Sequence, residues 1–483
     1  MTAPVERIAL APDLEIARVI TGLWQVADME RDGRVLDPDA TAAAMVPYVK
    51  AGFTTFDMAD HYGSAELIAG RHRVLHRSPA TQLFTKWVPK PGPVTRADVR
   101  VAVERAVARL QGAPIDLMQF HAWTFADAHW LDALWYLAEL RTEGLIRHIG
   151  VTNFDAAHLR IAVASGIPLL TNQVSFSLLD QRAAGRLSEV CLQYGVKLLA
   201  YGTVAGGLLS ARWQARPEPP KDDLKTWSLM KYGRFMQAAG GWAALQRVLS
   251  VTAGLASKHR VSMANVACRY ILDFPAVAGV IIGARLGERA HVDDNARLAT
   301  LRLDDADRAA LHDVLATLTP IPGDCGDEYR TPPFLTASGD LSHHVESFPA
   351  PYAVTKVSDT RSYCLSGTVW EPLAGYSRAT RHGNRIMVSG TTATHGPHQI
   401  GGTDPAAQTH FVLDKIEGAL ISLGGALSQV VRTRVFVDDI AQWEPIARAL
   451  GERFGQILPA NTMVQAKLIG AGYLVEIEAD AEL

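Results

Sequence analysis

The stretch that decides the fold spans residues 53–66 and reads FTTFDMADHYGSAE. A short apolar strand, Thr54–Phe56, stops on the acid Asp57. The turn that follows carries Tyr62, and a helix is expected to begin near Ser64. The pattern predicts a buried strand that presents polar side chains at its carboxyl end.

Two later strands end in the same manner. Leu83–Thr85 stops at Lys86, and Leu117–Phe120 stops at His121. The intervals from Asp57 to Lys86 and from Lys86 to His121 are roughly 30 residues, the length of one strand-and-helix unit of an eight-fold barrel. We therefore expect these polar side chains to converge at one mouth of a parallel barrel.

Together these side chains suit proton transfer to a substrate. A phenol with a pKa near ~10 is a poor acid at neutral pH unless a neighbouring cation favours its phenolate. Lys86 could supply that charge beside Tyr62. Asp57 would hold the lysine, and His121 would orient a substrate carbonyl. The alternative is a buried tyrosine beside a structural salt bridge, which leaves the position of His121 unexplained.

The four residues resemble the catalytic tetrad of the aldo-keto reductases, and the resemblance extends from about Ile16 to Leu318. It implies an oxidoreductase that uses NADPH to reduce a small carbonyl substrate, an aldehyde or a ketone, to an alcohol. Within that resemblance Tyr62 is the proton donor.

A regular alternation of strands and helices supports a (β/α)8 TIM barrel over about residues 1–320. Strands are expected near 18–20, 54–56, 83–85, 117–120, 146–152, 169–174, 197–201 and 278–282. Helices are expected near 37–51, 65–74, 96–110, 127–142, 156–164, 181–194 and 262–273. A hairpin over 7–16 would close the bottom, and a long insertion, 204–241, would either cover the site or pack on the barrel flank.

The cofactor site is expected at the last strand ends, because no G-x-G-x-x-G follows an early strand. After strand eight, Arg285 and Arg289 offer two guanidinium groups that suit a phosphate. The alternative is that this segment is only a solvent-exposed run of charged residues. By resemblance the cofactor is NADPH or NADP+, and Tyr201 stacks on its nicotinamide. The expected cofactor ligands are Thr152, Asn153, Gln173, Tyr201, Gly202, Gly206, Gly283, Arg285, Arg289 and Asn295.

Three tryptophans follow or end strands one, three and four. Trp24, Trp87 and Trp123 could form an apolar substrate wall, although a tryptophan is often part of a core.

The character of the chain changes after Leu318. Residues 321–360 are expected to be a linker or wrapping arm, because they contain prolines and no sustained periodicity. Residues 361–483 predict a small α+β domain with a ββαβαββ-like order. Three motifs, 388–391, 458–460 and 474–479, resemble the RidA (YjgF) family, which implies a chorismate-mutase-like fold and assembly as a trimer.

The same resemblance implies a small pocket in the C-terminal domain, formed by Tyr376, Ser389, Gly390, Thr391, Asn461 and Glu476. Asn461 stands where catalytic relatives have an arginine that binds the substrate carboxylate. An asparagine lacks the paired, charged N–H donors with which an arginine binds a carboxylate. We therefore expect equally that the domain serves the assembly of the protein.

Composition and charge limit the partners and the cellular location that we expect for this protein. The net charge of the 483 residues is −3, which offers no electrostatic reason to expect a nucleic-acid partner. The four cysteines are far apart, so we expect reduced thiols, no metal site and a cytoplasmic location. No stretch predicts a membrane span.

The prediction is therefore an NADPH-dependent carbonyl reductase fused to a RidA-like domain. It is expected to bind neither nucleic acid nor a membrane and to assemble as a homo-oligomer, such as a trimer. One rival is a bifunctional enzyme that couples imine or enamine chemistry to the reduction. The other is a non-catalytic ligand-binding subunit, which the intact tetrad argues against.

Overall fold

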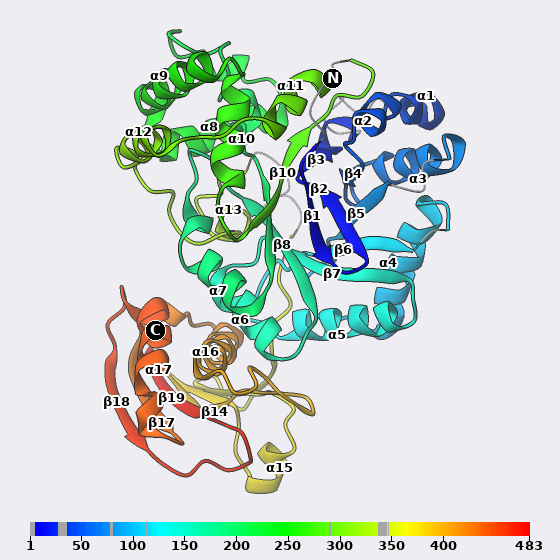
Figure 1. Ribbon diagram of the computed structural model, residues 1–483. Coiled ribbons are helices and arrows are strands. Elements are labelled where there is room, and N and C mark those ends of the chain that lie inside the picture. Colours follow the sequence, from blue (N-terminus) through cyan, green and yellow to red (C-terminus); the bar gives the residue numbers. More distant parts are fainter. Residues whose placement is uncertain are drawn as a thin grey trace.

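The chain forms a large N-terminal barrel and a smaller C-terminal α+β domain (Figure 1). The computed structural model describes residues 5–27, 36–77, 81–112, 114–288, 291–336, 345 and 347–483. The predicted fold class is confirmed for both parts.

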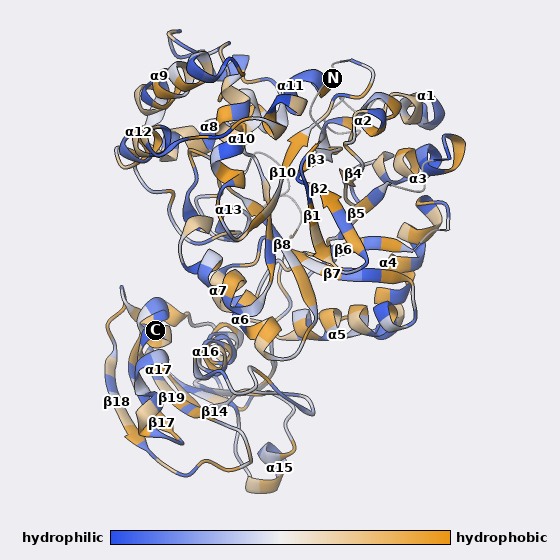
Figure 2. Cartoon of the chain, viewed as in Figure 1, coloured by the Kyte–Doolittle hydropathy of each residue, from blue (hydrophilic) through white to orange (hydrophobic). Residues whose placement is uncertain are grey.

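Eight parallel strands close the barrel in the order β10-β3-β4-β5-β6-β7-β8-β9. Their bounds are β3 Val19–Gly22, β4 Thr55–Asp57, β5 Gln82–Trp87, β6 Ile115–Phe120, β7 Ile146–Thr152, β8 Leu169–Ser175, β9 Lys197–Tyr201 and β10 Val277–Gly283. Because every neighbouring pair is parallel, all eight carboxyl ends meet at one mouth. In Figure 2 strand β10 is coloured mostly as apolar, as expected of a strand covered on both faces.

A hairpin closes the opposite end of the barrel, as the sequence predicted. Its strands are β1 Arg7–Ala11 and β2 Leu14–Ala17. Leu14 and Ile16 are fully buried and pack with barrel residues such as Phe84. The interior is therefore a packed core below the mouth and not a pore.

Helices surround the barrel and begin at good capping residues. Thr95 and Asp98 form a reciprocal capping box at the start of α4, and Ser262 caps α10. The helices around the barrel are α1 Pro38–Ala43, α2 Val46–Lys50, α3 Ala65–Leu75, α4 Arg96–Arg109, α5 His129–Thr142, α6 Ala156–Ala164, α7 Arg186–Tyr194 and α10 Met263–Leu272. After β10 come α11 Val292–Ala296 and α12 Asp305–Leu315.

The insertion between β9 and β10 is helical and longer than predicted. It contains α8 Trp227–Ala238 and α9 Gly241–His259, which share a second core that includes Phe235 and Leu249. The sequence reading ended the insertion at Gly241 and missed α9, because the helix buries its apolar side against neighbours that only the folded chain brings to it.

The C-terminal domain is a seven-stranded sheet in the order β11-β12-β13-β14-β19-β17-β18. Its strands are β11 Ala353–Lys356, β12 Arg361–Leu365, β13 Ala379–His382, β14 Arg385–Thr392, β17 Val430–Val437, β18 Ala460–Gln465 and β19 Val475–Glu482. Two helices, α16 Pro405–Ser422 and α17 Trp443–Phe454, cover one face of this sheet. The connections between strands contain the short helix α15 Trp370–Ala374 and a small hairpin, β15 Thr394–His395 and β16 His398–Gln399. The first strand, β11, lies inside the segment that we expected to be a linker.

The helix layer of the C-terminal domain packs on the barrel. Helix α16 lies against α6, and at Gly418 a β-carbon would come within 2.4 Å of the Ala126 carbonyl oxygen, so only glycine allows this approach (Figure 1). Ion pairs cross the junction from Arg160 Nη1 to Asp404 Oδ2 at 2.8 Å and from Arg186 Nη1 to Glu452 Oε2 at 2.8 Å.

His158 is the central polar residue of this junction. Its ring stacks on Phe125 with 3.5 Å between centroids. Nδ1 lies 2.7 Å from Asp155, and Nε2 lies 3.1 Å from Asp414 of α16. Burial opposes the charged form of His158, but the two carboxylates outweigh it and raise its pKa to about 9.

No helix within the described residues is long and apolar enough to cross a membrane.

The raised pKa of His158 predicts a pH-dependent junction. The stabilisation is fully present below about pH 6.5, the ordinary pKa of histidine, and is lost as the pH rises through about 9. We expect His158→Gln to lower the melting temperature strongly at the acid end of this window and much less at the alkaline end. His312→Gln, at an exposed position, is the control. A difference between His158→Gln and the wild type that stayed constant across the window would contradict the assignment.

Candidate active site

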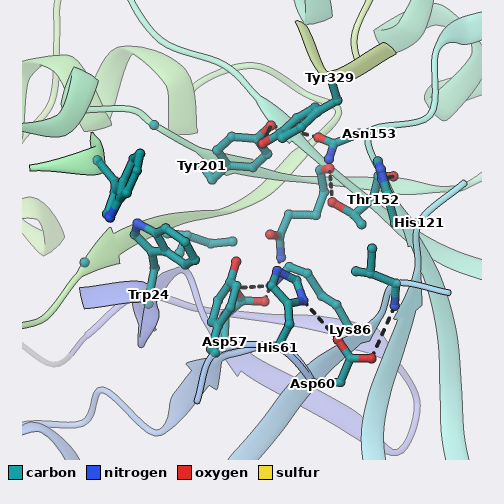
Figure 3. Close-up of a pocket in the computed structure, with 18 of the residues that line it drawn as sticks. Trp24, Asp57, Asp60, His61, Lys86, His121, Thr152, Asn153, Tyr201 and Tyr329 are labelled. Carbon is teal, nitrogen blue, oxygen red and sulfur yellow. Dashed lines mark hydrogen bonds and ion pairs between the residues drawn. The ribbon is translucent and has the colours of Figure 1, made fainter. Parts of the chain in front are cut away.

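The four predicted catalytic residues meet at the barrel mouth. Asp57 ends β4, Lys86 lies in β5, His121 follows β6, and Tyr62 lies in the loop before α3. All four line one cavity of about 520 Å³, within the range of ordinary ligand pockets (Figure 3).

Asp57 is the anchor of the cavity floor. Its Oδ2 accepts a hydrogen bond from Lys86 Nζ at 2.6 Å. Its Oδ1 accepts from the side-chain amides of Gln119 at 3.0 Å and Gln173 at 2.7 Å. Both members of the ion pair are buried, so these extra donors help to offset the cost of removing the charges from water. Burial lowers the pKa of Lys86, and Asp57 partly restores it.

Tyr62 lies beside this ion pair. Lys86 Nζ is 5.3 Å from the centre of the Tyr62 ring, and the Trp24 ring packs edge-on at 4.9 Å. Burial raises the pKa of Tyr62 well above its ordinary value, and the charge of Asp57 raises it further. Burial, and after it the charge of Asp57, together outweigh the effect that we expected from Lys86. Tyr62 therefore carries its proton at neutral pH.

His121 is held from three sides. Its Nδ1 lies 3.4 Å from the Thr152 carbonyl oxygen. Its ring meets Trp123 edge-on at 4.6 Å and Tyr329 at 5.7 Å. These contacts fix the plane of the imidazole at the cavity wall.

The predicted nicotinamide ligands line the same cavity. The Tyr201 hydroxyl donates to Asn153 Oδ1 at 2.8 Å, and Thr152 Oγ1 donates to the Gln173 carbonyl oxygen at 3.0 Å. Gly202, Gly206 and Gly283 also line it. Next to them Gly207 has a φ of +97°, and nothing described lies within 4 Å of the place where its β-carbon would be. The three predicted glycines are covered by other residues, since a β-carbon would come within 2.2 Å of the Tyr232 hydroxyl at Gly202 and within 2.2 Å of Gln25 Oε1 at Gly283.

Not every predicted residue reaches the cavity. Arg285, which lies 3.9 Å from Glu288, and Asn295 in α11 are not among its lining residues, and Arg289 lies outside the described residues. Trp24 and Trp123 line the cavity, but Trp87 does not. Trp87 packs on Phe120 in the core at 5.6 Å, because successive side chains of a strand alternate and Lys86 takes the inward position.

Other lining residues were missed in the sequence. From the insertion, α8 contributes Trp227, Lys231 and Tyr232, so this loop does reach the site. Lys231 Nζ donates to the Tyr329 hydroxyl at 2.7 Å. Tyr329 belongs to α13, Asp327–Arg330, in the segment after the barrel, and no sequence pattern marks it as a site residue (Figure 3).

The C-terminal pocket residues are only partly brought together. The Arg378 guanidinium donates to the Gly390 carbonyl oxygen at 2.7 Å, to Thr391 Oγ1 at 2.8 Å and to the Tyr376 hydroxyl at 3.3 Å. Glu476 lies over Gly390, where a β-carbon would come within 2.0 Å of its Oε1. Ser389 Oγ donates to the Ser377 carbonyl oxygen at 2.8 Å.

Asn461 lies apart from that group. It is on β18, two strands from β19 in the sheet order, and its Nδ2 donates to Thr433 Oγ1 at 2.8 Å. Arg378 is held inside the domain, because its Nη1 and Nη2 make hydrogen bonds there and its Nε lies 3.7 Å from Glu371 Oε1.

Comparison with known proteins agrees with both halves of this description. A parallel barrel with Asp, Tyr, Lys and His at its mouth defines a class of oxidoreductases that act on carbonyl groups. Residues 18–316 match the Aldo/keto reductase family, to which the chain belongs. Residues 368–483 match the family described as Endoribonuclease L-PSP, and this region is RidA-like.

Individual relatives cover mainly the barrel. Flagellar radial spoke protein 5 of Chlamydomonas reinhardtii is 34% identical over 223 residues, which are 40% of this chain and 42% of that protein. The 6-dehydroglucose reductase of Agrobacterium fabrum is 26% identical over 322 residues, 62% of this chain and 94% of that protein. The glycerol dehydrogenase of Gluconobacter oxydans is 23% identical with a TM-score of 0.54, covering 65% and 95% of the two chains, and shares the fold.

Proposed function

We propose that the barrel uses NADPH to reduce an aldehyde or ketone to an alcohol. The observation that carries the proposal is the convergence of Asp57, Tyr62, Lys86 and His121 in one cavity. The residues predicted to bind the nicotinamide, Thr152, Asn153, Gln173 and Tyr201, line the same cavity. The family membership makes the protein an oxidoreductase that reduces carbonyl compounds, and the choice of cofactor and the residue roles are our inference.

The bound cofactor would supply a hydride to the carbonyl carbon. Tyr62 keeps its proton because it is buried, and it donates that proton to the carbonyl oxygen as negative charge develops there. Lys86 places a positive charge near the phenol, which lessens the cost of the phenolate that remains. Thus the carbon gains the hydride and the oxygen gains the phenol proton.

His121 and the aromatic walls position the substrate. The imidazole is held by Thr152 and faces the cavity beside Trp123, so it can hydrogen-bond a carbonyl oxygen that approaches Tyr62. Trp24 on the other side of Tyr62 limits the directions from which a substrate can enter.

For the C-terminal domain we propose assembly of the chain, most simply as a trimer. The face of the sheet opposite α16 and α17 carries Met387, which is 36% exposed, and Val464 at the edge strand is 44% exposed. A sheet with such a face and an open edge strand is suited to pairing with another copy.

We also propose a cytoplasmic location. All four cysteines are free and buried, which suits a reducing compartment.

For the reduction itself, the first prediction concerns the proton donor, Tyr62. Tyr62→Phe removes the hydroxyl and keeps the ring, so the reduction rate should fall by about 10²-fold or more. Lys86→Met should act in the same direction. NADPH binding, followed by fluorescence, should persist in Tyr62→Phe, and Tyr136→Phe on α5 is the control. Near-normal turnover of Tyr62→Phe would remove this residue from the mechanism.

The second prediction concerns cofactor choice. If Arg285 and Arg289 bind the 2′-phosphate, replacing both with alanine should weaken NADPH about tenfold or more relative to NADH, since charge-assisted hydrogen bonds are worth roughly 1.5–3 kcal/mol each. Arg247→Ala on α9 is the control. An equal loss of affinity for NADPH and for NADH would show that the two arginines do not bind the 2′-phosphate.

The third prediction concerns the C-terminal domain. Full-length protein should behave as a trimer in light scattering and should not accelerate ammonia release from 2-imino acids generated in solution. The reason is that Asn461 carries no charge to offset the desolvation of a substrate carboxylate, and that Arg378 is bonded inside the domain. A monomer would contradict the assembly, and rapid ammonia release would favour a bifunctional enzyme.

A further inference from the structure

A second cavity lies at the junction of the two domains. It measures about 890 Å³, compared with about 520 Å³ for the reductase cavity. Loops at the barrel mouth form one wall, and α16 and α17 form the other. Trp123 lines both cavities, but no step of the proposed reduction uses the second one.

Negative charge dominates this junction cavity. Seven carboxylates line it, against three arginines and His158, so acids exceed cations even with the histidine protonated. Arg453 is shared between Asp414 and Glu417, at 2.5 and 2.6 Å. Arg186 is shared between Glu452 at 2.8 Å and Asp324 at 3.3 Å. Each of these arginines therefore serves two acids.

Two of the carboxylates are poorly compensated. Asp327 accepts a hydrogen bond from the Asp324 backbone N–H at 2.8 Å but forms no ion pair with any described residue. Burial raises the pKa of Asp324 to about 6, and the nearby charge of Asp155 adds to the effect. The pKa of Asp327 is raised for the same two reasons. A cation in the cavity would relieve this repulsion.

His410 of α16 supplies an independent sign of a missing hydrogen-bond donor. The residue is 4% exposed and lines the cavity. Its Nε2 lies 3.5 Å from Glu452 Oε2, and a neutral ring with its proton on Nε2, towards that carboxylate, has a lone pair on Nδ1. Nδ1 has no hydrogen-bond partner in the described part of the chain. Burial lowers the pKa of His410 to about 4, so the ring is neutral and accepts.

The remaining wall suits a short hydrocarbon. Phe348 and Ile421 line the cavity and are 40% and 42% exposed. Arg330 also lines the cavity: its Nε donates to the Ala122 carbonyl oxygen at 2.9 Å and its Nη2 to the Asn153 carbonyl oxygen at 2.6 Å, while its Nη1 has no hydrogen-bond partner among the described residues. The seven carboxylates outnumber the arginines, so the cavity as a whole favours a cation.

We propose that the junction cavity is a second ligand site that binds a small organic amine as its ammonium ion. The ammonium group donates to His410 Nδ1 and neutralises the carboxylates near Asp327, and the hydrocarbon part lies on Phe348 and Ile421. The site exists only where the two domains meet, and it does not depend on the reductase activity.

Isothermal titration calorimetry of the full-length chain tests this assignment with three matched probes, butan-1-amine, butan-1-ol and butyrate. At neutral pH the amine is protonated, as its pKa resembles the value of about 10.4 for lysine. We expect the amine to bind with a Kd of about 1 mM or below and the alcohol and the acid to bind much more weakly. Asp327→Asn and His410→Phe should each weaken the amine about tenfold, the usual effect of losing a hydrogen bond to a charged group.

Asp222→Asn, an exposed acid in the β9–β10 insertion, is the matched control and should leave the affinity unchanged. Asp327→Asn keeps an oxygen that can accept from the Asp324 N–H, so this variant should fold, and circular dichroism checks it. The proposal is overturned if butan-1-amine binds no better than butan-1-ol, if butyrate binds best, or if both cavity variants bind the amine as the wild type does.

Discussion

The buried ion pair between Asp57 and Lys86 is the interaction on which the barrel mouth depends. An unpaired charge at this depth would cost several kcal/mol, so the strands must bring both partners and their extra donors together. The donors Gln119 and Gln173 come from β6 and β8, and the ion pair itself joins β4 and β5. Tyr62 remains protonated first because it is buried, and the negative charge of Asp57 adds to this effect.

The segment that leaves the barrel completes this mouth before it reaches the C-terminal domain. Glu328 is buried and pairs with Arg182 at 3.0 Å, and Arg330 donates to the carbonyl oxygens of Ala122 and Asn153. Tyr329 is thereby held between Tyr201 and His121. Through Tyr329 the connection is part of the reductase site, and its neighbours Asp324, Asp327 and Arg330 line the junction cavity.

Much of the fold and of the site could be predicted from the sequence because the signals were local. Asp57, Lys86 and His121 each follow a short apolar run, and their spacing matches the repeat of a parallel barrel. Trp87 shows the limit of such reasoning. Its place at the end of a strand suggested substrate contact, but the alternation of side chains puts it in the core beside Phe120. Helix α9 was missed because its partners lie in α8 and α12, which are separate elements of the chain.

The sequence by itself determined the order of strands and helices, the two family resemblances and the identity of the residues at the barrel mouth. These depend on apolar periodicity and on short motifs, which the chain carries locally. Only the tertiary structure decided that Gln119 holds Asp57, that Lys231 and Tyr329 enter the mouth, and that His158 joins the two domains. Those contacts link residues far apart in the chain, and their energy comes from burial, which no local pattern specifies.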